Sequence, residues 1–200
     1  MMTQPNLIQN MGLPFIILVG LILALIPIAT VIEIFELRPY YSLEQLSVEP
    51  WRLLSGHFVH ASWSHLAVNL LNLILLRFVF REWISTNTFI AFLIFNALFI
   101  SIGLWTITQL TSYVGFSGIF HGLLIYLLLL YRGNAPIIFS IAITCVIGKV
   151  IYEQLYGASP ALAEFIGVGV AIDSHALGTA AGMTFYVLQI ALGLIRLRTR

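Results

Sequence analysis

The chain has 200 residues, of which 60% are hydrophobic and only 8% are charged, and its mean hydropathy is +1.01. A soluble domain of this size carries far more charge, so the composition indicates an all-α protein with several membrane spans. The formal net charge of +1 provides no basic surface, so we expect no nucleic-acid partner. The single cysteine, Cys145, excludes a disulfide framework and a cysteine-based metal site.

Six apolar stretches are long enough, or nearly so, to cross a hydrocarbon core of about 30 Å. No Lys or Arg lies within Met1–Met11, and Glu33 follows the first stretch in place of a small-residue cleavage site, so we expect a retained span there. The sequence predicts one polytopic membrane domain over residues 1–200. Its helices run roughly over 12–32, 62–81, 88–108, 117–131, 136–155 and 174–195.

Arginine residues orient this expected six-helix bundle. Arg77, Arg132 and Arg196 lie at the ends of the second, fourth and sixth stretches, whereas the loop after the first is rich in glutamate. The excess of positive charge in cytoplasmic loops predicts that both termini are cytoplasmic, which requires an even number of spans and agrees with six. The second, fourth and sixth helices then begin at the outer side of the membrane.

Polar residues gather near those outer ends. About 22 Å of helix separates Ser117 from Arg132, and about 24 Å separates His65 from the end of its stretch, so the two lie at nearly the same depth. About 31 Å separates His175 from Arg196, which requires the sixth helix to tilt or to extend into the cytoplasm if His175 is to reach Ser117.

Ser117 and His175 form the candidate catalytic pair. A serine hydroxyl needs a base within hydrogen-bond distance, and neutral imidazole provides one near neutral pH. Gly115 and Gly118 permit a tight turn and let a substrate carbonyl approach the amides at a helix start, which would form part of an oxyanion hole. The alternative is that Ser117 only caps a helix after a glycine turn.

The residues around His175 favour close helix packing. Gly178 and Gly182 form a small-xxx-small face that would let the fourth helix approach and bring hydroxyl to imidazole. Simple helix dimerisation explains the glycines but leaves an ionisable residue in lipid without a role. Asp173 could orient the histidine, although a carboxylate at a helix start is normally solvated.

His65 and Asn69 are one helical turn apart and share a face, so both can donate hydrogen bonds to a developing oxyanion. Alternatively, they hydrogen-bond across helices and hold the bundle together. His57, His60 and His65 suggest a metal site, but no acidic residue accompanies them at ligand spacing, so we expect neither a metal nor another cofactor.

Three further polar residues lie in the fourth and fifth stretches. His121 follows Ser117 by one turn and is placed to stack on or hydrogen-bond to the catalytic imidazole, or to make a purely structural contact. Lys149 and Glu153 are four residues apart, and we expect a mutual ion pair that makes both tolerable in lipid, with substrate contact as the alternative.

The ordered set of motifs resembles the rhomboid family of intramembrane serine proteases over most of the chain. The resemblance implies a six-helix fold and a Ser117/His175 dyad, with an oxyanion hole made by the Ser117 amide and the side chains of His65 and Asn69. It gives His60 and His121 supporting roles. The motifs are, in chain order, Trp51-Arg52, His60, His65-x-x-x-Asn69, Gly115-Phe-Ser117-Gly118 and His175-x-x-Gly178-x-x-x-Gly182.

Two departures from the family pattern concern the surroundings of the dyad. His121 stands where many rhomboids have a tyrosine, and Ser174 precedes the histidine where alanine or glycine is usual. With the Lys149-Val-Ile-Tyr-Glu153-Gln154 stretch, the Gly-x-Ser-Gly-x-x-His motif is similar to the rhombosortase subgroup. That resemblance implies a protease of the bacterial inner membrane, with its active site toward the periplasm.

The expected partners are membrane lipids and the C-terminal anchors of exported proteins, each consisting of a Gly-Gly motif, a hydrophobic helix and a basic tail. One alternative is a general rhomboid protease that cleaves other single-span proteins. Another is a non-catalytic rhomboid-like binder of membrane helices, but such proteins typically lack Ser117 or His175, and both are present. A transporter would need polar groups through the cytoplasmic half, where the sequence has few.

Overall fold

The computed structural model describes residues 40–80, 84–108 and 110–195. The first expected span, 12–32, and Arg196, from which a cytoplasmic end was predicted, lie outside these residues. Each of the other five expected spans corresponds to one long helix. These helices are α3 (Trp63–Val79), α4 (Thr86–Ile107), α5 (Ser117–Tyr131), α6 (Pro136–Tyr156) and α8 (Ile172–Ala191).

Two of the five helices, α4 and α6, are long and apolar enough to cross a membrane by themselves, and α3 is a shorter apolar helix. The mostly helical structure agrees with the predicted fold class, whereas the count of six spans stays a prediction. The helix boundaries follow local signals. Ser62 and Ser85 cap α3 and α4 by accepting hydrogen bonds from backbone amides, and Pro136 occupies the first turn of α6.

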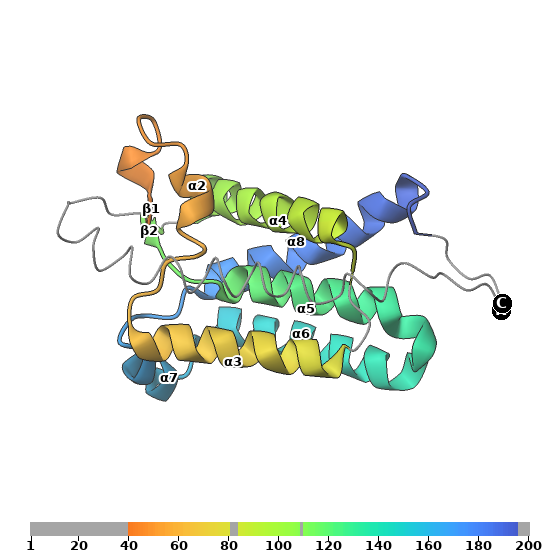
Figure 1. Cartoon of the computed structure of the whole chain (residues 1–200). Coiled ribbons are helices and arrows are strands. Elements are labelled where there is room, and N and C mark those ends of the chain that lie inside the picture. Colours follow the sequence, from red (N-terminus) through yellow and green to blue (C-terminus); the bar gives the residue numbers. More distant parts are fainter. Residues whose placement is uncertain (1–39, 81–83, 109, 196–200) are drawn as a thin grey trace.

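Helix α5 lies in the centre of the bundle (Figure 1), where it packs against α3, α4, α6 and α8. Its side chains are therefore buried on nearly all sides, including Ile119, Leu123 and Tyr126. Because every long described helix touches α5, a residue at its start can meet side chains from several of them.

The contact between α5 and α8 depends on glycine. A Cβ atom at Gly118 would lie 2.9 Å from the Ser174 carbonyl oxygen, and one at Gly122 would lie 2.6 Å from the Gly178 carbonyl oxygen. These distances are too short for any side chain, so the two backbones touch directly. The close approach expected from Gly178 and Gly182 is present, and Gly118 and Gly122 of α5 are the glycines that face them.

Short elements gather at one end of the bundle, where α3, α5 and α8 begin (Figure 1). Strands β1 (Tyr41–Ser42) and β2 (Ser112–Tyr113) form an antiparallel ladder. The hydroxyl of Ser62 donates to the Ile166 carbonyl oxygen at 2.5 Å, which ties the last residue of α7 to the start of α3. The sequence pattern did not predict these elements, which also include η1 (Leu43–Gln45), α2 (Arg52–Ser55) and α7 (Pro160–Ile166). The turn η2 (Arg132–Asn134) joins α5 to α6 at the other end.

Helix α8 is shorter than the stretch predicted for it, because it ends at Ala191 rather than continuing to residue 195. About 24 Å of helix then separates His175 from the helix end, similar to the length of the predicted second span below His65. Residues 192–195 are not helical, and the tilt or cytoplasmic extension of this helix stays a prediction.

Candidate active site

Ser117 is the first residue of α5, and a strained turn leads into it. Gly115 has φ +117°, a conformation that residues with a side chain rarely adopt. The Tyr113 hydroxyl donates a hydrogen bond to the Gly115 carbonyl oxygen, and burial raises the pKa of Tyr113 to about 12, so the hydroxyl stays a donor. The turn therefore sets Ser117 at a helix start, where backbone amides lack intrahelical partners.

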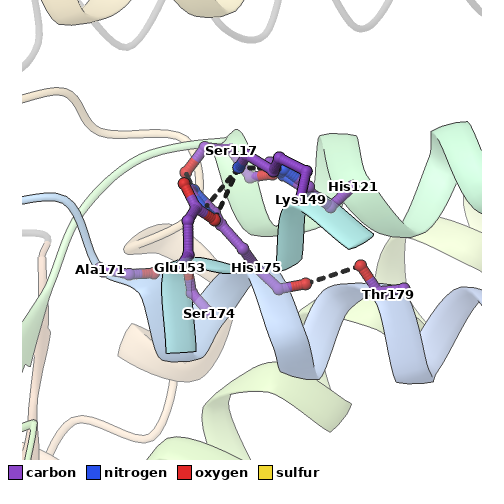
Figure 2. A network of polar contacts seen from close by, with 8 residues as sticks. All are labelled: Ser117, His121, Lys149, Glu153, Ala171, Ser174, His175 and Thr179. Atoms are coloured by element: carbon purple, nitrogen blue, oxygen red, sulfur yellow. Dashed lines mark hydrogen bonds and ion pairs between the residues drawn. The ribbon is translucent and has the colours of Figure 1, made fainter. Parts of the chain in front are cut away.

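The hydroxyl of Ser117 meets His175 of α8. The Ser117 Oγ atom is 3.0 Å from His175 Nε2, although the residues are 58 positions apart. His175 is only 4% exposed, and the Thr179 hydroxyl donates to its carbonyl oxygen at 2.8 Å, one turn along (Figure 2). The two residues singled out from the sequence therefore lie within hydrogen-bond distance.

The ring of His121 stacks on that of His175, with centroids 4.1 Å apart and an interplanar angle of 19°. Its Nδ1 atom is 2.7 Å from the Ser117 carbonyl oxygen. Of the placements open to His121 in the sequence, the structure has the stack on the candidate base.

Lys149 and Glu153 form the expected ion pair, with Nζ 2.7 Å from Oε2, but the pair does not stand alone. The same Oε2 atom is 2.9 Å from His175 Nδ1, and Lys149 Nζ is 2.9 Å from His121 Nε2. Figure 2 shows these side chains of α5, α6 and α8 pointing toward one another. The structure therefore places the pair beside the candidate catalytic residues.

A cavity of about 270 Å³ opens next to Ser117, with His65 and Asn69 of α3 on its wall. The His65 ring lies over Gly115 so closely that a Cβ atom there would be 2.7 Å from Cε1 and Nε2. Gly115 is therefore needed twice, for its backbone conformation and for the approach of His65. The Asn69 amide donates to the His65 carbonyl oxygen at 3.0 Å, and both side chains are buried.

The remaining candidates lie around this cavity or away from it. His60 contacts the His65 ring edge-on, with centroids 5.1 Å apart. His57 instead meets the Ser101 hydroxyl of α4 at 2.9 Å, so the three histidines do not converge on one point. Asp173 lies in the first turn of α8, and the carboxylate that contacts His175 is Glu153.

Residues 47–191 match the family model of the Rhomboid domain, which is most of the chain. The chain belongs to the rhomboid family. Rhomboids are generally serine-type intramembrane peptidases that act on transmembrane substrates, and the apolar helices agree with a membrane protein. None of the curated proteins compared with the chain matches it.

The sequence interpretation missed the position of Glu153 in this rhomboid, although a signal was available. The fifth predicted span is expected to run outward, so Glu153 near its end is expected at the outer level that the sequence predicts for Ser117 and His175. Lys149 lies about 20 Å of helix beyond Pro136, which is close to the depth estimated for Ser117. Comparing depths across all helices would have brought the four residues together.

Proposed function

We propose that this rhomboid is an intramembrane serine endopeptidase in which Ser117 is the nucleophile and His175 the general base. The observation that carries the proposal is the 3.0 Å contact between Ser117 Oγ and His175 Nε2 at the wall of a cavity. A helix cap would explain the serine alone. It would not explain an imidazole on the hydroxyl with polar side chains of other helices around it.

The reaction follows from these contacts. Ser117 Oγ forms a bond to the substrate carbonyl carbon while its proton passes to His175 Nε2. When the peptide C–N bond breaks, His175 returns that proton to the leaving amine. A water molecule then gives a proton to His175 as its oxygen bonds to the acyl carbon. His175 passes that proton to Ser117 Oγ as the bond between Oγ and the acyl carbon breaks, which restores the free enzyme.

The substrate carbonyl must first be freed. In a transmembrane helix that oxygen is already hydrogen-bonded, so the segment to be cut has to unwind before it can bind. In the tetrahedral intermediate, the Ser117 amide and the side chains of His65 and Asn69 stabilise the oxyanion. The support for this role is their position on the same cavity wall as Ser117.

Ser117→Ala tests the nucleophile. The variant should fold normally and lose cleavage of a single-span membrane reporter, because no hydroxyl remains to form the acyl-enzyme. Ser47→Ala changes an exposed serine in the first loop and serves as the matched control. Cleavage by the Ser117→Ala protein at the wild-type rate would remove this serine from the mechanism.

We further propose that the substrates are C-terminal anchors made of a Gly-Gly motif, a hydrophobic helix and a basic tail on exported bacterial proteins. The support is the Gly115-Phe-Ser117-Gly118-x-x-His121 motif with the Lys149–Glu153 pair, which is similar to rhombosortases. Small residues at the cut also suit a cavity of only about 270 Å³. On this proposal the protein lies in the bacterial inner membrane, with both termini cytoplasmic and the active site toward the periplasm.

Comparative proteomics tests the substrate class. In a strain that lacks the protein, or carries only Ser117→Ala, exported proteins should keep a Gly-Gly hydrophobic tail that the wild-type strain removes. If the C-termini are the same in both strains while a single-span reporter is still cleaved, the protein is a general rhomboid protease instead.

A further inference from the structure

We propose that Glu153 is a positioning residue of the catalytic group, which holds His175 in the tautomer that Ser117 requires. This inference rests on the proposed protease function and adds a residue to it. The Glu153 side chain is only 8% exposed, within a helix whose exposed residues are mostly apolar. A carboxylate persists in such surroundings only when specific partners compensate its charge.

The position of the His175 proton is inferred from the nearest contact of Nδ1, because Glu153 Oε2 lies closer to it than Lys149 Nζ, which is 3.2 Å away. Nδ1 lies 2.9 Å from Glu153 Oε2. If Nδ1 carried no proton, its lone pair would face a carboxylate oxygen at that distance, and the two would repel each other. Nδ1 therefore donates to Glu153, which leaves Nε2 as the acceptor for the Ser117 hydroxyl at 3.0 Å.

Lys149 contacts the same carboxylate oxygen as His175. Its Nζ atom donates to Glu153 Oε2 at 2.7 Å and to His121 Nε2 at 2.9 Å. His121 can accept at Nε2 because its Nδ1 atom donates to the Ser117 carbonyl oxygen at 2.7 Å. The contacts thus form a continuous hydrogen-bond network through α5, α6 and α8, from the Ser117 hydroxyl to the Ser117 carbonyl oxygen.

Neither a purely structural ion pair nor a metal site accounts for all of these contacts. An ion pair explains Lys149 and Glu153 but not the histidine on the same carboxylate oxygen. A metal ion between His121, Glu153 and His175, whose ligand atoms lie within 4.8 Å of one another, would have to displace the Lys149 ammonium, which lies within 3.2 Å of all three. The position between these residues already holds a cation that belongs to the chain.

The carboxylate matters most when His175 takes the proton of Ser117. The imidazolium then lies 3.2 Å from the Lys149 ammonium. Two positive charges at that separation destabilise each other unless a negative charge contacts both. Glu153 supplies that charge at Nδ1 and stabilises the imidazolium without taking its proton.

Glu153→Gln keeps the size of the side chain and removes the charge. With a fluorophosphonate probe, whose phosphorus bonds to Ser117 Oγ as fluoride leaves and His175 takes the proton, the maximal inactivation rate should fall by about 100-fold or more. Probe affinity should stay within about twofold of wild type, because Glu153 is not among the residues that line the cavity. Glu153→Asp should recover at least about tenfold of the lost rate. Glu44→Gln, an exposed carboxylate on η1, is the matched control.

A second measurement needs no variant of Glu153. Nitrogen-15 NMR of histidine-labelled wild-type protein, with His175 assigned by comparison with His175→Ala, should show the proton on Nδ1. A proton on Nε2 instead, or a folded Glu153→Gln protein that reacts at the wild-type rate, would overturn the inference. If the wild-type protein fails to react with the probe at Ser117, the proposed function is wrong, and the NMR experiment still tests the contact with Glu153.

Discussion

Replacing Gly178 with alanine should disable the site without touching any residue that takes part in the reaction. In the structure, a Cβ atom on residue 178 would lie 2.7 Å from the Gly118 carbonyl carbon and 3.2 Å from its Cα atom. Ordinary contacts between carbon atoms are about 3.5–4.0 Å, so α5 and α8 must move apart by about 1 Å. Gly118 adjoins Ser117, and His175 lies one turn from Gly178, so the separation falls directly on the dyad.

The Ser117–His175 contact would lengthen from 3.0 Å to about 4 Å, beyond hydrogen-bond distance. A displacement of about 1 Å costs about 100-fold in rate, and overpacking costs about 1–3 kcal/mol in stability. The assay is the rate of fluorophosphonate inactivation in detergent, together with the thermal unfolding midpoint.

Gly148→Ala in α6 is the matched control, because a Cβ there meets nothing within 4 Å among the atoms of the structure. That variant should keep the wild-type rate. A Gly178→Ala protein that also reacts at the wild-type rate would refute the argument that glycine contacts set the dyad distance.

Two further predictions concern the first loop and the turn before α5. Gly115→Ala places a Cβ 2.7 Å from the His65 ring at φ +117°, so reporter cleavage should fall by about 100-fold as the oxyanion donor is displaced. Gly133→Ala, where a Cβ meets nothing within 4 Å, should keep full activity. Equal cleavage rates for the two variants would contradict the role of His65 as an oxyanion donor. Burial lowers the pKa of His57 from 6.5 to about 3, so unfolding favours proton uptake below pH 6.5 and stability falls as the pH drops. About 2 kcal/mol should be lost between pH 8 and pH 5 because of His57. Thermal unfolding of His57→Gln should show that much less pH dependence, and an unchanged slope would contradict the burial of a neutral ring.

The helices were predictable because lipid imposes a simple rule on the sequence. The stretch 117–131 coincides with α5, since Gly115 and the turn after Tyr131 interrupt an otherwise continuous apolar run. The depth argument grouped His65 with Ser117, and the structure places both on the wall of one cavity. It overestimated the distance for His175, because Arg196 lies beyond the end of α8 at Ala191.

The role of Glu153 was harder to predict, because spacing within one helix offers a complete local explanation. Lys149 and Glu153 satisfy each other at four-residue spacing, so nothing in their own stretch indicates a third partner. Only the packing of α6 beside α8 brings His175 to the same carboxylate oxygen. The short elements α7 and the β1–β2 ladder escaped prediction for a related reason, since elements of so few residues carry no periodic pattern.

The most direct test is to find the atom that reacts. Wild-type protein in native membranes is treated with a fluorophosphonate probe, and the site of attachment is mapped by mass spectrometry, alongside His175→Ala. A single adduct on Ser117, formed at a rate that collapses when His175 is absent, is the predicted result. An adduct on another residue, or equal labelling of Ser117 without His175, would contradict a serine nucleophile activated by that histidine.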